Sequence, residues 1–82
     1  MTRDEVLAAI AAAVATVLEI DPATVTPAQR FTQDLRADSL ALVEIVEIIE
    51  ELLSGSGFAF DDEDLDDLQT VGDVLDYALA RL

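Results

Sequence analysis

Three stretches of the sequence carry apolar residues at spacings of three and four, and each opens on a residue that favours helix initiation. The stretches begin at Thr2, at Asp38-Ser39 and at Thr70. A capping residue followed by an apolar stripe of helical period is typical of an amphipathic helix packed on a core. Both prolines and two of the three glycines fall between the stretches, at Pro22, Pro27, Gly55 and Gly57. The pattern therefore predicts an all-α fold in which each helix buries one face.

The first helix is expected from Thr2 to about Leu18 or Glu19. Thr2 and Glu5 are spaced for a capping box, in which each side chain accepts the other residue's amide. Alanines favour helix and allow a neighbouring helix to approach closely. They lie between the apolar residues Val6, Leu7, Ile10, Val14, Val17 and Leu18.

A long loop is expected between the first two helices, from Ile20 to Ala37. This region has two prolines and no helical period. A structureless stretch of this length is unusual in a small domain and is more often functional or internally packed. Phe31 and Leu35 are expected to anchor the loop on the core.

The second helix is expected to begin at Asp38-Ser39, to end at Ser54–Gly57, and to be the most buried helix. Its apolar face is wide and is interrupted only by glutamates. After the glycines, Phe58 and Phe60 alternate with Ala59, which predicts that both rings return to the core. The face consists of Leu40, Leu42, Val43, Ile45, Val46, Ile48, Ile49, Leu52 and Leu53.

Two further helices are expected, the first of them short. Leu65 and Leu68 are three residues apart within an acidic stretch, Asp61 to Gln69, which is enough for one or two turns. Thr70 and Asp73 then have capping-box spacing before a helical stripe. That stripe consists of Val71, Val74, Leu75, Ala78, Leu79 and Leu82. We therefore expect one domain over residues 1–82, a small four-helix bundle of three main helices and one short one.

The missing residue types restrict the chemistry of the chain. It contains no His and no Cys, which excludes serine–histidine dyads, cysteine nucleophiles and imidazole or thiolate metal sites. We expect that it is not an enzyme. Its 18 acidic and 4 basic residues give a net charge of -14, which repels nucleic acid and anionic membrane surfaces. The expected partners are basic protein surfaces.

A membrane role is not expected from the apolar run between Ala8 and Leu18. The run is shorter than the roughly 20 residues of a transmembrane helix. Asp4 and Glu5 occupy the region that would be basic in a signal peptide. We expect a cytoplasmic protein without membrane insertion.

Residues 31–40, with the sequence FTQDLRADSL, resemble the phosphopantetheine attachment region of acyl carrier proteins. An Asp-Ser pair before a helix is, by itself, most often only a cap. Here it is followed by residues 43–46 and Glu50-Glu51, which also match the family. Thr70 to Asp73, with Tyr77, resembles the start of the family's last helix. The resemblance covers nearly the whole chain, including the order of the helices and the long first loop.

The resemblance implies that Ser39, flanked by Asp38 and Leu40, is the attachment site. A separate phosphopantetheinyl transferase would transfer 4'-phosphopantetheine from coenzyme A to the Ser39 hydroxyl, and acyl groups would be carried on its thiol as thioesters. Ser39 has no internal base to activate it, so that enzyme must supply the catalysis. Further expected partners are acyl-loading ligases and synthase or transferase enzymes with basic patches. The chain is expected to be a free-standing monomer in fatty acid synthesis or in a dedicated lipid, polyketide or lipopeptide pathway.

The resemblance also implies that the second helix is the docking surface. Glu44, Glu47, Glu50 and Glu51 would present carboxylates to Arg and Lys of successive enzymes. A row of glutamates in an arbitrary protein is usually only a solvated helix face. Beside the carrier motif, docking is the favoured interpretation.

The sequence differs from the usual pattern of the family at three places. These differences bear on which enzymes the chain binds more than on which family it resembles. Arg36 stands where the family usually has Gly, and it would be strained if that position needs a positive φ. Ala41 occupies a position that is often acidic in the family. Ser54–Gly57 resembles a short insertion, followed by Phe58 and Phe60 in place of the usual aliphatic pair.

Two alternative interpretations of the function remain open. A peptidyl or aminoacyl carrier is the nearest, although such carriers more often have Gly-Gly-Asp-Ser and less negative charge. An unmodified acidic helical adaptor that binds a basic partner belongs to a different class. A calcium loop over Asp62–Asp67 is disfavoured, because Asp67 stands where an EF-hand requires Gly and Asp73 replaces the closing Glu. No metal site is therefore expected.

Overall fold

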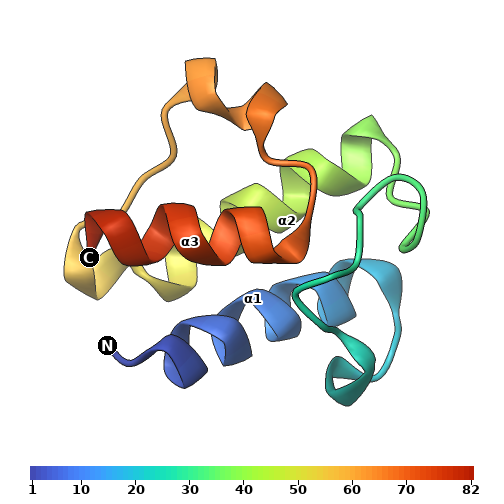
Figure 1. Ribbon diagram of the computed structural model, residues 1–82, viewed down its shortest axis with the longest axis horizontal. Coiled ribbons are helices and arrows are strands. Elements are labelled where there is room, and N and C mark those ends of the chain that lie inside the picture. The colour runs from blue at the N-terminus through green and yellow to red at the C-terminus, as the bar shows by residue number, and fades with distance from the viewer.

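The computed structural model describes residues 1–82 and consists of helices, turns and loops without a strand. The α-helices are α1 (Arg3–Leu18), α2 (Ser39–Leu52) and α3 (Val71–Arg81), and the short helix is the 3₁₀ helix η3 (Asp62–Asp67). Single 3₁₀ turns lie at Pro22–Thr24 and Ser54–Ser56. Figure 1 shows the three long helices packed together and the segment containing η3 arching over one side. The predicted all-α fold of three main helices and one short one is confirmed.

Reciprocal capping explains where α1 begins. The Thr2 hydroxyl accepts the Glu5 amide at 3.2 Å, and the Glu5 carboxylate accepts the Thr2 amide at 3.0 Å. These bonds hold the pKa of Glu5 below its usual range. At the other end Glu19 enters the left-handed region, with a φ of 57°, and donates its amide to the Ala15 carbonyl. The predicted bounds of this helix are confirmed.

The expectation that the second helix is the most buried is wrong. α2 buries only Ile45 and Ile49 fully. It packs mainly against α1, which also packs against α3. α1 thus forms the centre of the bundle and buries Val6, Ile10, Ala11, Ala13 and Val14. The wide apolar face of α2 extends beyond the area that α1 covers, so Leu40 and Val43 stay 68% and 54% exposed.

The loop between α1 and α2 is held by its own residues and by the start of α3. Phe31 is buried and Leu35 is half-buried, which confirms both predicted anchors. Val25 and Ala37 are also buried, which the sequence pattern did not indicate. The Phe31 amide donates to the Gln69 carbonyl at 3.0 Å. The loop therefore fixes the position from which α2 starts.

The second half of the chain follows its predicted pattern. Phe58 and Phe60 are buried. α3 opens with a capping box between Thr70 and Asp73, as predicted. The Gly72 amide donates to the Pro27 carbonyl at 2.8 Å, so the first turn of α3 lies directly against the loop. No helix in the structure has the length and apolar character needed to cross a membrane.

Candidate functional site

Ser39 is the first residue of α2, and its hydroxyl takes no part in capping the helix. The cap is Asp38, whose carboxylate accepts the Ala41 amide at 2.8 Å. Ser39 is exposed, and its hydroxyl makes no hydrogen bond within the chain. An exposed and uncommitted hydroxyl is available to a modifying enzyme. Of the other residues expected at the site, Asp38 is an exposed cap and Leu40 points largely into solvent.

Arg36, three residues before Ser39, adopts a positive φ of 57°. The backbone of Arg36 is therefore strained, because residues with a Cβ are disfavoured in the left-handed region. The turn lets the Ala37 amide donate to the Phe31 carbonyl at 2.8 Å. Arg36 is exposed and forms no ion pair, whereas the other three arginines each pair with a carboxylate.

Beside Ser39 lies a cavity of about 490 Å³ between α2 and the segment that contains η3. Ten of its fifteen lining residues are hydrophobic. α2 contributes one wall, from Ser39 to Glu50, and Leu65 and Leu68 contribute the opposite one. Leu65 and Leu68 are half-buried. The cavity can therefore accept an apolar group that enters from the direction of Ser39.

The four glutamates of α2 do not share one environment. Glu44, Glu47 and Glu51 are exposed, as a docking surface requires. Glu50 is half-buried, and its carboxylate accepts the Phe60 amide at 2.9 Å. Glu50 therefore fixes the chain that follows α2 as well as contributing charge.

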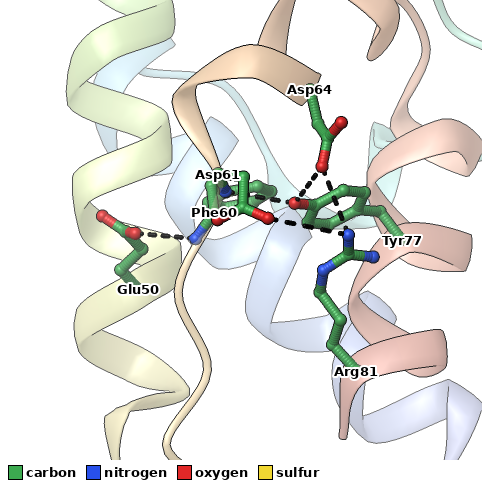
Figure 2. Close-up of polar contacts among 6 residues, drawn as sticks. All are labelled: Glu50, Phe60, Asp61, Asp64, Tyr77 and Arg81. Atoms are coloured by element: carbon green, nitrogen blue, oxygen red, sulfur yellow. Dashed lines mark hydrogen bonds and ion pairs between the residues drawn. The ribbon is translucent and has the colours of Figure 1, made fainter.

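A polar clasp, formed by Asp61, Asp64, Tyr77 and Arg81, joins the start of η3 to α3 (Figure 2). The Tyr77 hydroxyl donates to the Asp64 carboxylate at 2.8 Å and accepts the Asp61 amide at 3.1 Å. Arg81 pairs with Asp64 at 3.2 Å and with Asp61 at 4.0 Å, and its guanidinium lies 3.6 Å from the centre of the Tyr77 ring. Burial, with help from the bond to Asp64, raises the pKa of Tyr77. The phenol is therefore protonated and donating at neutral pH.

Sequence reasoning missed the clasp. Tyr77 and Arg81 are four residues apart on one helix face, a spacing that does allow a side-chain pair. Nothing in the sequence selects Asp64 from its acidic neighbours as their partner. No group of three or more acidic side chains converges to hold a metal ion, including those of the calcium-like stretch after Asp61.

The geometry around Ser39 fits the phosphopantetheine arm that the resemblance implies. The hydroxyl is exposed at the amino end of a 14-residue helix, where first-turn amides and the helix dipole favour a phosphate. The apolar cavity opens beside it. Ser39 would hold the arm covalently, with Asp38 fixing the turn.

The comparisons with known proteins agree with this site. The family model described as the phosphopantetheine attachment site matches residues 8–78. The chain is 42% identical over 77 residues to the acyl carrier protein of Thermosynechococcus vestitus, and the match covers 94% of this chain and 91% of that protein. It is equally similar to the meromycolate extension acyl carrier protein of Mycobacterium leprae, of which it spans 64%.

A solved structure of the acyl carrier protein from Enterococcus faecalis has the same fold. The two superpose with a TM-score of 0.77 at 33% sequence identity, and the match covers 100% of both chains. Because the family model and a full-length relative both cover Ser39 and its helix, the chain belongs to the acyl carrier protein family, whose members are carriers modified with phosphopantetheine and not enzymes.

Proposed function

We propose that residues 1–82 act as one acyl-carrier domain in which Ser39 bears the 4'-phosphopantetheine. The observation that carries the proposal is the exposed Ser39 hydroxyl, which is free of hydrogen bonds and lies beside an apolar cavity. When bound, the arm supplies the thiol on which acyl groups are carried as thioesters. This supply matters because the chain has no cysteine of its own.

The chain's own residues present the hydroxyl and do not activate it. Asp38 is the nearest carboxylate in sequence, and one of its oxygens is engaged by the Ala41 amide. No histidine is present to act as a base. The phosphopantetheinyl transferase therefore has to deprotonate Ser39, and Asp38 keeps the first turn of α2 in the conformation that presents it.

The cavity gives a carried chain a place away from water. Each methylene that moves from water into an apolar site contributes about 0.8 kcal/mol. Leu42, Val46 and Ile49 line the α2 side, and Leu65 and Leu68 line the other. A saturated acyl chain in this cavity should therefore raise the melting temperature of the protein.

The carried group is proposed to be a fatty acyl chain or a similar lipid-type chain. The cavity lining is mainly aliphatic and aromatic, which suits a fatty acyl group better than an aminoacyl group. Fatty acid synthesis or a dedicated lipid or polyketide pathway therefore fits better than peptide assembly. Cytoplasmic location and a monomeric state stay predictions.

Acyl loading tests this proposal. After modification with coenzyme A and a broad-specificity transferase, the chain is incubated with an acyl-loading ligase, ATP and a saturated fatty acid. The intact mass should rise by one acyl group, and neutral hydroxylamine should remove that group while leaving the arm. A peptidyl carrier would instead accept an amino acid from an adenylating enzyme and no fatty acid. An unmodified adaptor would gain neither mass.

We also propose α2 as the docking surface for partners with basic patches. Exposed Glu44 and Glu47 lie beside the exposed apolar residues Leu40 and Val43. Charge steers a basic partner to this helix, and the apolar residues then lose their contact with water. Glu51 adds charge at the far end. Glu50 adds less, because its carboxylate is held by Phe60.

Charge reversal separates local docking from net charge. Glu44→Lys and Glu47→Lys should slow arm transfer and acyl loading, mainly through association, with little change in stability. Glu63→Lys and Asp66→Lys are matched controls, since both residues are exposed and each pair changes the net charge equally. The difference should shrink as salt rises and the Debye length falls to about 8 Å near 0.15 M. Equal losses in both pairs would show that only net charge matters.

A further inference from the structure

The cavity beside Ser39 ends at an aromatic side chain. Its α2 wall runs from Ser39 to Ile49 and Glu50, a distance of about 15 Å along the helix at a rise of about 1.5 Å per residue. Phe60 lies at this far end, because its amide donates to the Glu50 carboxylate at 2.9 Å and its ring lines the cavity. A chain that enters beside Ser39 and follows α2 therefore meets Phe60 last.

The Phe60 ring is held on two sides by other aromatic rings. It stacks on Tyr77 at 5.5 Å between centroids and 16° between planes, and it meets Phe58 edge-on at 4.8 Å and 80°. Phe58 and Phe60 are both less than 10% exposed. Aromatic pairs in such arrangements have specific geometries that resist displacement.

Tyr77, behind Phe60, is itself fixed by the polar clasp. Figure 2 shows its hydroxyl between Asp61 and Asp64, with Arg81 against the ring. The opposite wall is held only at its two ends, where Asp64 belongs to the clasp and Gln69 bonds to Phe31 and Asp73. From Leu65 to Leu68 the only backbone hydrogen bonds are local, within the segment itself. An entering chain can therefore displace the wall formed by Leu65 and Leu68 more readily than it can displace Phe60.

We infer that Phe60, held against Tyr77 by the clasp, sets the longest acyl chain that the cavity can shelter. This rests on the proposed function, because it requires that acyl chains enter the cavity. Phe60 acts as a specificity-determining residue: the cavity widens sideways by movement of Leu65 and Leu68, and its depth stays fixed. Chains longer than that depth must leave their ends in water or break the aromatic stack.

A chain-length series tests the inference. The full chain is modified, loaded with even-numbered saturated acyl groups from butyryl to palmitoyl, and melted. For the wild type the melting temperature should rise with each step and then stay level once the chain end reaches Phe60. Phe60→Leu should move the level region to a chain at least one step longer, and Phe60→Ala should move it further.

Phe58→Leu is the matched control. Phe58 is as buried as Phe60 and contacts the same rings, but it does not line the cavity. Phe58→Leu should lower the melting temperature of every form without moving the level region, because the Phe60 ring and its stack on Tyr77 are kept. If Phe60→Ala does not fold, Phe60→Leu carries the comparison. A nuclear Overhauser effect between the terminal methyl of the longest sheltered chain and the Phe60 ring then gives a second measurement.

The outcomes separate the inference from the proposed function. If the melting temperature levels off at the same chain length in the wild type and in both Phe60 variants, the role of Phe60 is overturned and the carrier function stays intact. A series in which the melting temperature ignores chain length would overturn entry into the cavity, and the inference with it. Failure of Ser39 to accept the arm would overturn the proposed function itself.

Discussion

Replacing Arg36 with glycine should stabilise the protein, although no contact is gained. Arg36 has a φ of 57°, is exposed and forms no ion pair. A residue with a Cβ in the left-handed region destabilises the folded state by about 1–2 kcal/mol, whereas glycine does not. Glycine costs about 0.5–1 kcal/mol because it has more freedom to lose on folding. Taken from the middle of each range, the free energy of unfolding should therefore increase by about 0.5–1 kcal/mol.

This change is measurable by thermal and urea unfolding. For a domain of this size, 1 kcal/mol shifts the melting temperature by about 4–8 °C, so Arg36→Gly should raise it by about 2–8 °C. The urea midpoint should rise with an unchanged slope, since the folded state keeps its compactness.

Arg36→Ala separates strain from charge. It removes the same positive charge from a chain of net charge -14 but keeps a Cβ in the left-handed region. The difference between the glycine and alanine variants therefore contains no charge effect and measures the relief of strain less the freedom that glycine loses on folding. If Arg36→Gly is no more stable than Arg36→Ala, the strain argument is refuted.

Two further predictions concern packing and titration. Gly72→Ala should lower the free energy of unfolding by about 1 kcal/mol, because an added Cβ would lie 3.0 Å from the Pro27 carbonyl oxygen. Gly55→Ala meets nothing within 4 Å, so it should raise the free energy of unfolding by about 0.5–1 kcal/mol, and urea unfolding compares the two variants. Tyr77 is the single tyrosine, so absorbance should show its pKa above the usual range in the native protein and normal in urea. Because the folded pKa is the higher one, the stabilisation from the neutral phenol is complete below the usual pKa. It is lost as pH rises toward the folded value, and an unshifted native titration would contradict the burial of Tyr77.

The elements that the sequence predicted well are those fixed by local chemistry. The capping boxes at Thr2 and Thr70 involve residues three apart, so the starts of α1 and α3 could be read directly. The position of Ser39 at the start of α2 was predicted for the same reason.

The structural features that the sequence did not predict depend on contacts between residues far apart in the chain. The apolar face of α2 showed how much surface could be buried, but not that α1 would cover only part of it. The exposed Leu40 and Val43 result from that partial cover. The clasp joins Asp64 to Tyr77 and Arg81, 13 and 17 residues away. The sequence did not predict the positive φ of Arg36 by itself. The resemblance indicated only that Arg36 would be strained if this position, which is usually glycine in the family, needed a positive φ.

The central claim, that Ser39 alone receives the arm, is tested most directly by intact mass. Wild type, Ser39→Ala and the double variant Ser54→Ala/Ser56→Ala are each incubated with coenzyme A and a broad-specificity phosphopantetheinyl transferase. Wild type and the double variant should gain the mass of one arm, and Ser39→Ala should gain none. Because Asp38 is the cap of α2, Ser39→Ala should keep its helical circular dichroism, so the loss cannot come from unfolding. Modification of folded Ser39→Ala, or an unmodified wild type, would contradict the assignment.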